Sequence, residues 1–197
     1  MNLTLCFGGS FNPIHVGHLI CAQAAAEAGG FTGVTLIPAA RSPFKAQQPD
    51  QAPAADRLVM LRLAVEGSPF FAIDDLELSR SGPSYTIDTA RELRRRGMQK
   101  VHWLIGADSL IGLPNWHEPR ALLNEVDFHL MARPGFTFDF DKLPPEYRSL
   151  EKRIIQIPEI DISSTEIRNR VRAGKSITYL TPPKVVDYIK SNRLYLD

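Results

Sequence analysis

The feature that most constrains the fold of this chain is a regular alternation of short apolar segments with longer segments of helical pattern. The short segments are bounded by Gly, Pro or charged residues, and they predict strands over residues 3–7, 33–38, 71–80, 101–108, 127–135 and 153–158. The longer segments predict helices over residues 17–30, 55–67, 84–97, 116–126, 163–174 and 182–195. This order of elements predicts an α/β fold, a Rossmann-like, doubly wound parallel sheet with helices on both faces.

The length of the chain fits one domain. We expect a single domain over residues 1–197, with a small C-terminal helical part from about residue 163 to 197. A content of 44% hydrophobic and 23% charged residues is that of an ordinary globular protein with a buried core. The net charge of +1 gives no bulk reason to expect nucleic acid or an anionic membrane as a partner.

The cysteines and the apolar segments together predict a cytoplasmic location. Cys6 and Cys21 form neither a CxxC pair nor a dense framework, which fits a reducing compartment. The first residues show no basic segment followed by a long apolar core, so we expect no signal peptide. No apolar run reaches the roughly 18 residues that a membrane span needs, so we expect no membrane partner.

Residues with useful chemistry follow four of the expected strands. They are residues 8–18, the loop 41–45, residues 106–108 and Arg133. In a parallel sheet ligands bind beyond the carboxyl ends of the strands, where the strand order reverses. We therefore expect one binding site built from these segments.

The loop after the first strand reads GGSFNPIHVGH, residues 8–18. Gly8 and Gly9 would let the backbone approach a ligand, and the following helix presents free N–H groups to an anion. His15 and His18 are three residues apart near the helix start, roughly on one face. Imidazoles in that position can donate hydrogen bonds to phosphate oxygens, which is how phosphoryl transfer is mainly catalysed.

Two other interpretations of these histidines compete with the catalytic one. In the first, His15 and His18 only cap the helix and pack. In the second, they bind zinc together with Cys6 and Cys21. The spacing matches no usual zinc finger and Cys6 lies inside a strand, which argues against the metal.

A second motif, ISSTEIR at residues 162–168, begins a helix near the C-terminus. Ser163 and Glu166 have the spacing of a capping box. The same helix start offers hydroxyl groups and free N–H groups to an anion. Arg168 lies in the second turn, where its guanidinium could reach the same anion.

These motifs resemble those of a known group of enzymes. SFNPIHVGH, residues 10–18, resembles the [ST]-x-x-H-x-G-H signature of the nucleotidyltransferase superfamily, and ISSTEIR resembles its second signature. Segments 82–89, 103–110, 115–116, 132–135 and 174–195 resemble the bacterial nicotinate-nucleotide adenylyltransferases, so that the resemblance covers nearly the whole chain. Two departures are mild: Ser10 stands where many members have Thr, and Asn12 where many have Asp.

The resemblance implies a reaction. The enzyme would transfer AMP from ATP to nicotinate mononucleotide, giving nicotinate adenine dinucleotide and pyrophosphate, with Mg²⁺ accompanying ATP and no metal held by side chains. The nucleophile would be a phosphate oxygen that is already ionised at neutral pH, so no strong general base is needed. Catalysis would rest on His15, His18, Lys45 and Arg168.

The resemblance also implies the binding residues. ATP would be bound by Gly8, Gly9, Ser10, Phe11, His15, His18, Gly106, Asp108, Ile162, Ser163, Ser164, Thr165 and Arg168. The acceptor nucleotide would be bound by Ser10, Asn12, Lys45, Ser84, Tyr85, Thr86, Trp116 and Arg133, with the Trp116 ring stacked on the pyridine. From residue chemistry alone, two alternatives stay open: Asp108 as a helix N-cap and Trp116 as a core residue.

Several further possibilities stay open or are set aside. The acceptor could be nicotinamide mononucleotide, alone or in addition, and a non-catalytic nucleotide sensor could share the same fold. The basic run at residues 91–97 is better explained as a solvated helix face than as an RNA site. Asp74 and Asp75 are expected in the middle of a strand and are therefore left out of the site. The sequence leaves the oligomeric state open, with a homodimer among the options.

Overall fold

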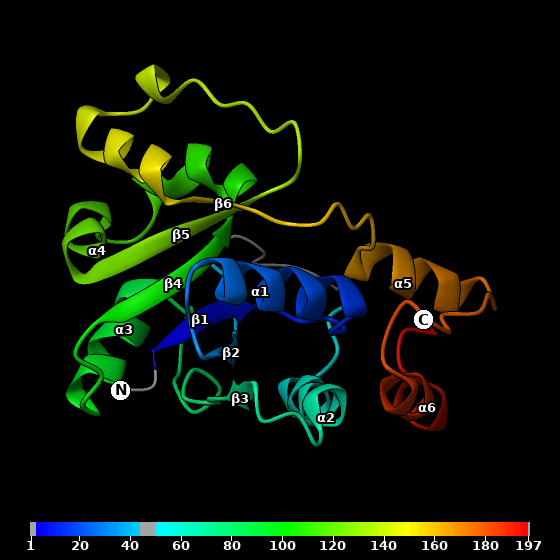
Figure 1. Ribbon diagram of the computed structural model, residues 1–197. Helices are drawn as coiled ribbons and strands as arrows, with labels where there is room; N and C mark the ends of the chain where they lie inside the picture. The colour runs from blue at the N-terminus through cyan, green and yellow to red at the C-terminus, as the bar shows by residue number, and fades with distance from the viewer. Residues whose placement is uncertain (1–2, 44–49, 197) are drawn as a thin grey trace.

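The fold is built on a six-stranded sheet in which every strand pair is parallel. The computed structural model describes residues 3–43 and 50–196 (Figure 1). The strands are β1 (Thr4–Gly9), β2 (Gly33–Pro38), β3 (Phe71–Ile73), β4 (Val101–Gly106), β5 (Val126–Ala132) and β6 (Ile154–Gln156). Their order is β3-β2-β1-β4-β5-β6, so the order reverses between β1 and β4. The predicted doubly wound parallel sheet is confirmed.

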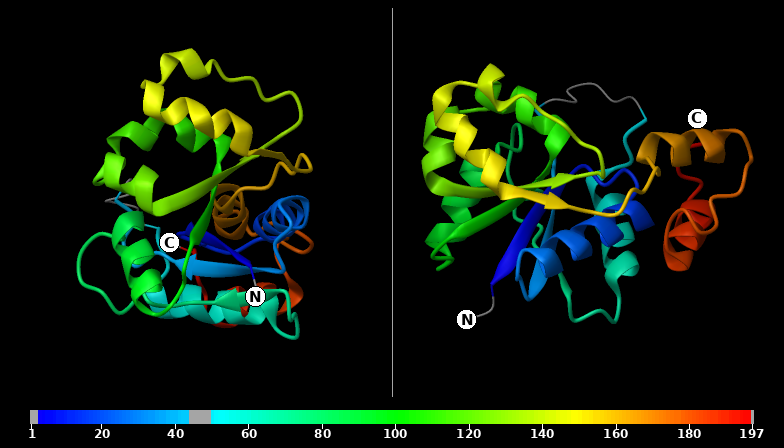
Figure 2. Two further views of the ribbon diagram at one scale, coloured as in Figure 1. Left: turned by 60° about the vertical axis from the view of Figure 1, so that its left-hand side comes forward. Right: turned by 45° about the horizontal axis from the view of Figure 1, so that its top comes forward.

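Helices cover both faces of the sheet (Figures 1 and 2). The α-helices are α1 (Val16–Ala28), α2 (Ala54–Val65), α3 (Thr86–Arg95), α4 (Pro119–Glu125), α5 (Ser164–Arg172) and α6 (Pro183–Ser191). The 3₁₀ helices are η1 (Ala107–Asn115), η2 (Phe140–Lys142) and η3 (Pro145–Arg153). Alternate strand residues enter different cores: Leu5 and Phe7 pack with α1, α2, α5 and α6, whereas Cys6 packs with α3, α4 and the 3₁₀ helices.

The third strand is much shorter than expected. β3 ends at Ile73, and the carboxylate of Asp74 then accepts a hydrogen bond from the Leu76 N–H at 3.0 Å. Such a side-chain bond to a backbone N–H two residues on makes the chain turn. The prediction of a strand over residues 71–80 is therefore wrong beyond Ile73, and Asp74 and Asp75 follow the strand end rather than lying inside it.

The basic run at residues 91–97 is neutralised by acidic neighbours. Arg91 pairs with Glu118 and Glu125, while Arg95 and Arg96 both pair with Glu92. These exposed ion pairs fit the solvated helix face that the sequence predicts.

The last two helices attach to the rest of the fold through α2 and the first loop. The Tyr188 hydroxyl of α6 donates to Asp56 of α2 at 2.8 Å. Beyond α6, the Tyr195 hydroxyl donates to Oδ1 of Asn12 in the first loop at 2.9 Å. The C-terminal segment thereby helps to hold the loop that follows β1.

Among residues 3–43 and 50–196, no helix combines the length and the apolar character that crossing a membrane requires.

Candidate active site

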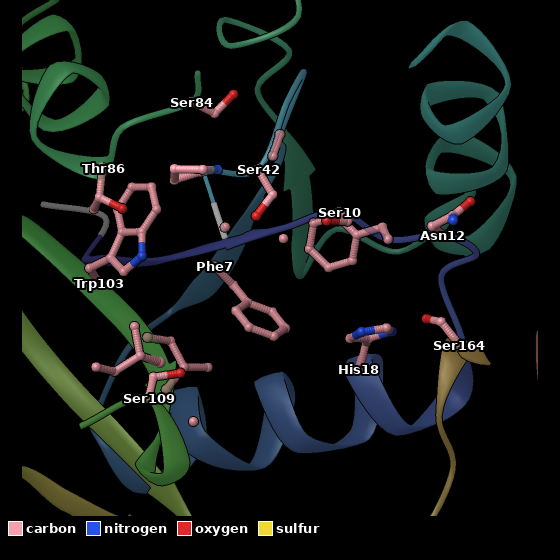
Figure 3. A pocket seen from close by; sticks show the side chains of 18 of the residues that line it. Phe7, Ser10, Asn12, His18, Ser42, Ser84, Thr86, Trp103, Ser109 and Ser164 are labelled. Atoms are coloured by element: carbon pink, nitrogen blue, oxygen red, sulfur yellow. The ribbon is translucent and has the colours of Figure 1, made fainter. Parts of the chain in front are cut away.

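A cavity of about 520 Å³ lies at the carboxyl ends of β1 and β4, where the strand order reverses (Figure 3). This is the place predicted from the alternation of strands and helices. Most of the site residues expected from the sequence line this cavity: Gly8, Gly9, Ser10, Phe11, Asn12, His15, His18, Ser84, Tyr85, Thr86, Gly106, Asp108, Trp116, Ile162, Ser163, Ser164, Thr165 and Arg168.

Two expected residues are not placed in the cavity. Lys45 lies outside the residues that the structure describes. Arg133 follows β5, one strand farther from the reversal point, and it does not line the cavity. Its guanidinium is half-exposed and lies 4.0 Å from Asp161. The expectation that Arg133 binds the acceptor nucleotide has no support from this position.

His15 and His18 begin α1 as a reciprocal pair. His15 is the N-cap residue, and its Nδ1 accepts the His18 N–H at 3.3 Å. The Nδ1 of His18 accepts the His15 N–H, also at 3.3 Å. The two rings stack with centroids 3.6 Å apart. The helix thus uses two imidazoles where a capping box normally uses Ser or Thr with Glu.

This pairing fixes the tautomer of both rings. A backbone N–H can only donate, so each Nδ1 must be the unprotonated acceptor. In a neutral imidazole the proton then sits on Nε2, which becomes a hydrogen-bond donor. Burial lowers the pKa of His15 to about 4, so this ring is neutral at pH 7. The N-cap and the catalytic interpretations are therefore compatible.

Aromatic side chains hold the first loop. The ring of Phe11 contacts the rings of His18 and Phe7 edge-on, with centroids 5.2 and 5.6 Å away. A Cβ at Gly8 would lie 2.5 Å from Cζ2 of Trp103, closer than packed carbon atoms approach. The position of the Trp103 indole against β1 thus requires a glycine at residue 8, whether or not a ligand also approaches the backbone there.

The start of α5 lies directly on this first loop. Ser163 is the N-cap of α5, and its hydroxyl oxygen accepts the Glu166 N–H at 3.1 Å, as the sequence predicts. The hydroxyl of Ser164 donates to the carbonyl of Pro13 at 2.8 Å. The two sequence motifs, far apart in the chain, therefore form one wall of the cavity, and Figure 3 shows Ser164 beside His18.

Arg168 ties three segments together. Only 4% of it is exposed, and it donates to Asp50 Oδ2 at 2.7 Å, to the Asn12 carbonyl at 2.9 Å and to Thr165 Oγ1 at 3.4 Å. Hydrogen bonds from Arg172 and Arg168 hold the pKa of Asp50 below its usual range. Three of the five guanidinium N–H groups are thus used within the described part of the chain, which leaves two for a phosphate.

Asn12 has a structural role that its sequence position does not reveal. Its side chain is 2% exposed. The carboxamide oxygen accepts from the Ala52 N–H at 3.0 Å and from the Tyr195 hydroxyl at 2.9 Å, while the amide nitrogen donates to the Asp50 carbonyl at 3.2 Å. These bonds use both lone pairs of the carboxamide oxygen and one of the two amide N–H groups, although Asn12 does line the cavity.

Arg57, which was not predicted as a functional residue, binds the loops that follow β1 and β2. It is 1% exposed and donates to the carbonyls of Ser10 at 2.7 Å, Ala52 at 3.1 Å and Ala40 at 3.3 Å. Buried cations require such partners. The loops after β1 and β2 are therefore fixed to one another by a single side chain.

The opposite end of the cavity is formed by the start of α3. Figure 3 shows Ser84 and Thr86 there, away from His18. The N-cap residue is Tyr85, and among the described residues no side-chain hydrogen bond caps this helix. The first-turn N–H groups and the positive end of the helix dipole are therefore open to an anionic group.

The aromatic residues Trp116 and His117 both stand near the start of α3 but make different contacts. His117 stacks on Tyr85 with ring centroids 4.1 Å apart, whereas Trp116 contacts Phe128 edge-on at 6.2 Å. Both Trp116 and His117 line the cavity. The cavity also contains residues that sequence reasoning missed: Ser42, Glu77, Trp103, Ser109, His117 and Met131.

Asp108 stands at the carboxyl end of β4. The N-cap position of η1 is Gly106, so Asp108 is not the helix cap that residue chemistry alone allowed. Asp108 lies in the first turn of η1, exposed and facing the cavity, where its carboxylate can accept from hydroxyl groups of a sugar.

Sequence comparisons identify similar proteins over the whole length. The profile of the family described as cytidylyltransferase-like matches residues 6–170. A probable nicotinate-nucleotide adenylyltransferase from Herpetosiphon aurantiacus is 40% identical over 192 residues, which cover 96% of each chain. One of the same name from Roseiflexus sp. is 40% identical over 190 residues, 95% of each chain.

Solved structures share the fold. The Plasmodium falciparum nicotinic acid mononucleotide adenylyltransferase complexed with NaAD superposes with a TM-score of 0.77 at 21% identity, covering 98% of this chain and 97% of that one. A putative nicotinate-nucleotide adenylyltransferase from Vibrio parahaemolyticus gives a TM-score of 0.70 at 18% identity, covering 100% and 97%. At these identities the likeness concerns the fold alone.

Proposed function

Since the chain belongs to the cytidylyltransferase-like family and, within it, to the nicotinate-nucleotide adenylyltransferases, we propose that it transfers AMP from ATP to nicotinate mononucleotide. The products are nicotinate adenine dinucleotide and pyrophosphate. The observation that carries this proposal is the union of both sequence motifs in one cavity. His15, His18 and the start of α5 lie at one end, and the uncapped start of α3 lies at the other.

The reaction is a displacement at the α-phosphorus of ATP. A phosphate oxygen of the acceptor forms the new P–O bond, the bond to the bridging oxygen of the β-phosphate breaks, and pyrophosphate leaves with the electron pair. The chain contributes position and charge. The Nε2–H groups of His15 and His18 and the first N–H groups of α5 donate to the phosphate oxygens, and Arg168 supplies a fixed positive charge.

Magnesium enters as part of the substrate in this proposal. Residues 3–43 and 50–196 contain no group of three or more His, Cys, Asp or Glu side chains that could hold a metal ion. We propose that Mg²⁺ arrives bound to the ATP phosphates. Lys45 is proposed to add a further cation to the same phosphates.

The acceptor is proposed to be the acid rather than the amide. A nicotinate ring carries a carboxylate, and the open start of α3 favours a negative group by about 0.3–1 kcal/mol from the helix dipole alone. Backbone N–H groups can pair with both carboxylate oxygens. A nicotinamide has an NH₂ group in place of one carboxylate oxygen, so one backbone N–H would face another donor and stay unpaired.

Labelled ATP tests the reaction. With ATP carrying ³²P on the α-phosphate, the label should move into a dinucleotide only when nicotinate mononucleotide is present, with one pyrophosphate released per dinucleotide. Label on the γ-phosphate should leave with pyrophosphate. If ATP binds and no label moves with any acceptor, the chain is a nucleotide sensor and not an enzyme.

We also propose that the protein works in the cytoplasm. Both cysteines, Cys6 and Cys21, are free thiols, and this supports a reducing compartment.

A further inference from the structure

Glu77 is a buried carboxylate in the wall of the cavity that the proposed reaction does not use. It is 4% exposed and follows the turn that Asp74 makes after β3. It lines the cavity together with Ser84, Tyr85 and Thr86. A buried negative charge is out of place in a cavity for two polyanionic nucleotides, so its presence requires a reason.

The hydrogen bonds of Glu77 lead to the start of α3. The Thr89 hydroxyl donates to Glu77 Oε1 at 2.6 Å, and the Ser84 hydroxyl also hydrogen-bonds to the carboxylate. Arg80 Nη2 lies 3.8 Å from Oε1 and donates to Thr89 Oγ1 at 2.6 Å. Glu77 therefore joins residues on both sides of Tyr85, which is the N-cap residue of α3.

The same contacts continue to the loop after β2. The Ala40 N–H donates to the Ser84 hydroxyl oxygen at 3.0 Å, and the Ser84 N–H donates to the Arg41 carbonyl at 2.8 Å. The Ser84 side chain also interacts with Glu77 and lowers the pKa of its carboxyl, while the Ser84 hydroxyl oxygen accepts from the Ala40 N–H. One carboxylate thus orients the helix start and the neighbouring loop together.

We propose that Glu77 is a positioning residue that sets the preference for an acidic over an amidated acceptor. This rests on the proposed function. In the proposed function, the groups that tell a carboxylate from an amide are first-turn N–H groups of α3 such as that of Thr86, because the Tyr85 N–H already donates to the Pro83 carbonyl at 3.1 Å. Their direction depends on what holds the first turn of α3. Glu77 acts through Ser84 and Thr89 without touching the acceptor, since the hydroxyls and Arg80 already surround its charge.

Three variants and two acceptors test this role. The variants are Glu77→Ala, Glu77→Gln and Ser84→Ala, and Asp75→Asn is the matched control, an exposed carboxylate from the same turn paired with Arg62. The measurement is kcat/KM for nicotinate mononucleotide and for nicotinamide mononucleotide at saturating ATP, together with KM for ATP.

The acid-to-amide ratio of kcat/KM should fall about 10-fold or more in Glu77→Ala, the size of effect expected when an aimed donor is lost. It should fall in the same direction in Ser84→Ala, while KM for ATP changes less than about 3-fold. Glu77→Gln keeps an acceptor for Thr89 and should retain most of the ratio, and Asp75→Asn should match the wild type. A general loss of folding would not move this ratio.

The results separate this inference from the proposed function. If Glu77→Ala and Ser84→Ala keep the wild-type ratio while the wild type prefers the acid, Glu77 has no role in selectivity and the proposed function stands. If Glu77→Ala fails to fold, Ser84→Ala alone decides. If the wild type makes no dinucleotide from either acceptor, the proposed function itself fails.

Discussion

His15 and His18 cap one another: each Nδ1 accepts the backbone N–H of the other residue at 3.3 Å. The two backbone nitrogens and the two Nδ1 atoms of these bonds therefore both cap α1 and orient the imidazoles in the cavity. The cap leaves the Nε2–H of each ring as the donor for phosphate oxygens. The two reciprocal bonds fix the tautomer of both rings, and the edge-on contact with Phe11 further orients the His18 ring.

Replacement of His18 by Ala should lower kcat about 10²–10³-fold, because one donor to the transition state is lost. The free energy of unfolding should fall by only about 1–2 kcal/mol, since the change removes a helix-capping bond and the edge-on contact with Phe11. Steady-state pyrophosphate release and urea unfolding measure the two effects. Ile20→Ala, an exposed change on the same helix, serves as the control. A folded His18→Ala protein with near-normal kcat would exclude His18 as a catalytic donor.

The mutual cap predicts the protonation state of His15 across pH. In ¹⁵N NMR spectra its Nε2 should carry the proton and its Nδ1 should be bare from pH 8 to about 5, because burial lowers its pKa to about 4. Protonation of Nδ1 would break the bond to the His18 N–H. A ring that titrates near pH 6.5, or that carries its proton on Nδ1, would contradict this assignment.

The same shift links stability to pH. In the unfolded chain His15 is protonated below about pH 6.5, whereas in the folded chain it is protonated only below about pH 4. The free energy of unfolding should therefore fall as pH drops from 6.5 to 4. His129, which is buried and whose Nε2 lies 3.1 Å from Nδ1 of His102, has its pKa lowered to about 4 and adds to this slope. In urea unfolding at several pH values, His129→Gln should have the shallower pH dependence.

Replacement of Gly8 by Ala should destabilise the fold by about 1–3 kcal/mol, because the new Cβ meets the Trp103 ring. The control is Gly112→Ala, where the nearest atom is 3.9 Å away and no atom has to move. Thermal unfolding of the two variants measures the difference. Equal midpoints would show that the Trp103 ring can shift at little cost.

Asn12 should act as a structural tie. Asn12→Ala should lower the free energy of unfolding by about 1–3 kcal/mol, because the Ala52 N–H loses its acceptor in a buried place. Tyr195→Phe removes only one of the bonds to Asn12 and should cost about 1 kcal/mol. Urea unfolding of both variants gives the comparison. An Asn12→Ala protein of wild-type stability with a raised KM for the acceptor would instead make Asn12 a substrate ligand.

Much of the fold can be predicted from the sequence because its signals are local. The alternation of apolar and helical segments predicts the parallel sheet. The spacing of Ser163 and Glu166 predicts the N-cap of α5. The length of β3 cannot be predicted in the same way. Residues 74–78 have a weak strand pattern, and the turn depends on one carboxylate bonding to a nearby N–H.

The cavity is harder to predict than the sheet, because it depends on contacts between distant segments. The paired histidines and ISSTEIR stand out as motifs, yet the partners of Asn12 and the buried position of Arg57 appear only when the loops meet. His117 is the residue after Trp116, and its ring stacks on Tyr85. The sequence does not show which of two neighbouring rings makes this contact, because neighbouring side chains point in different directions.

The most direct test of the account is the initial rate of pyrophosphate release from ATP and Mg²⁺ with three acceptor conditions: nicotinate mononucleotide, nicotinamide mononucleotide and no acceptor. We predict strong release with the acid, much weaker release with the amide and none without an acceptor. No release under any of the three conditions, from a folded protein that binds ATP, would contradict the account.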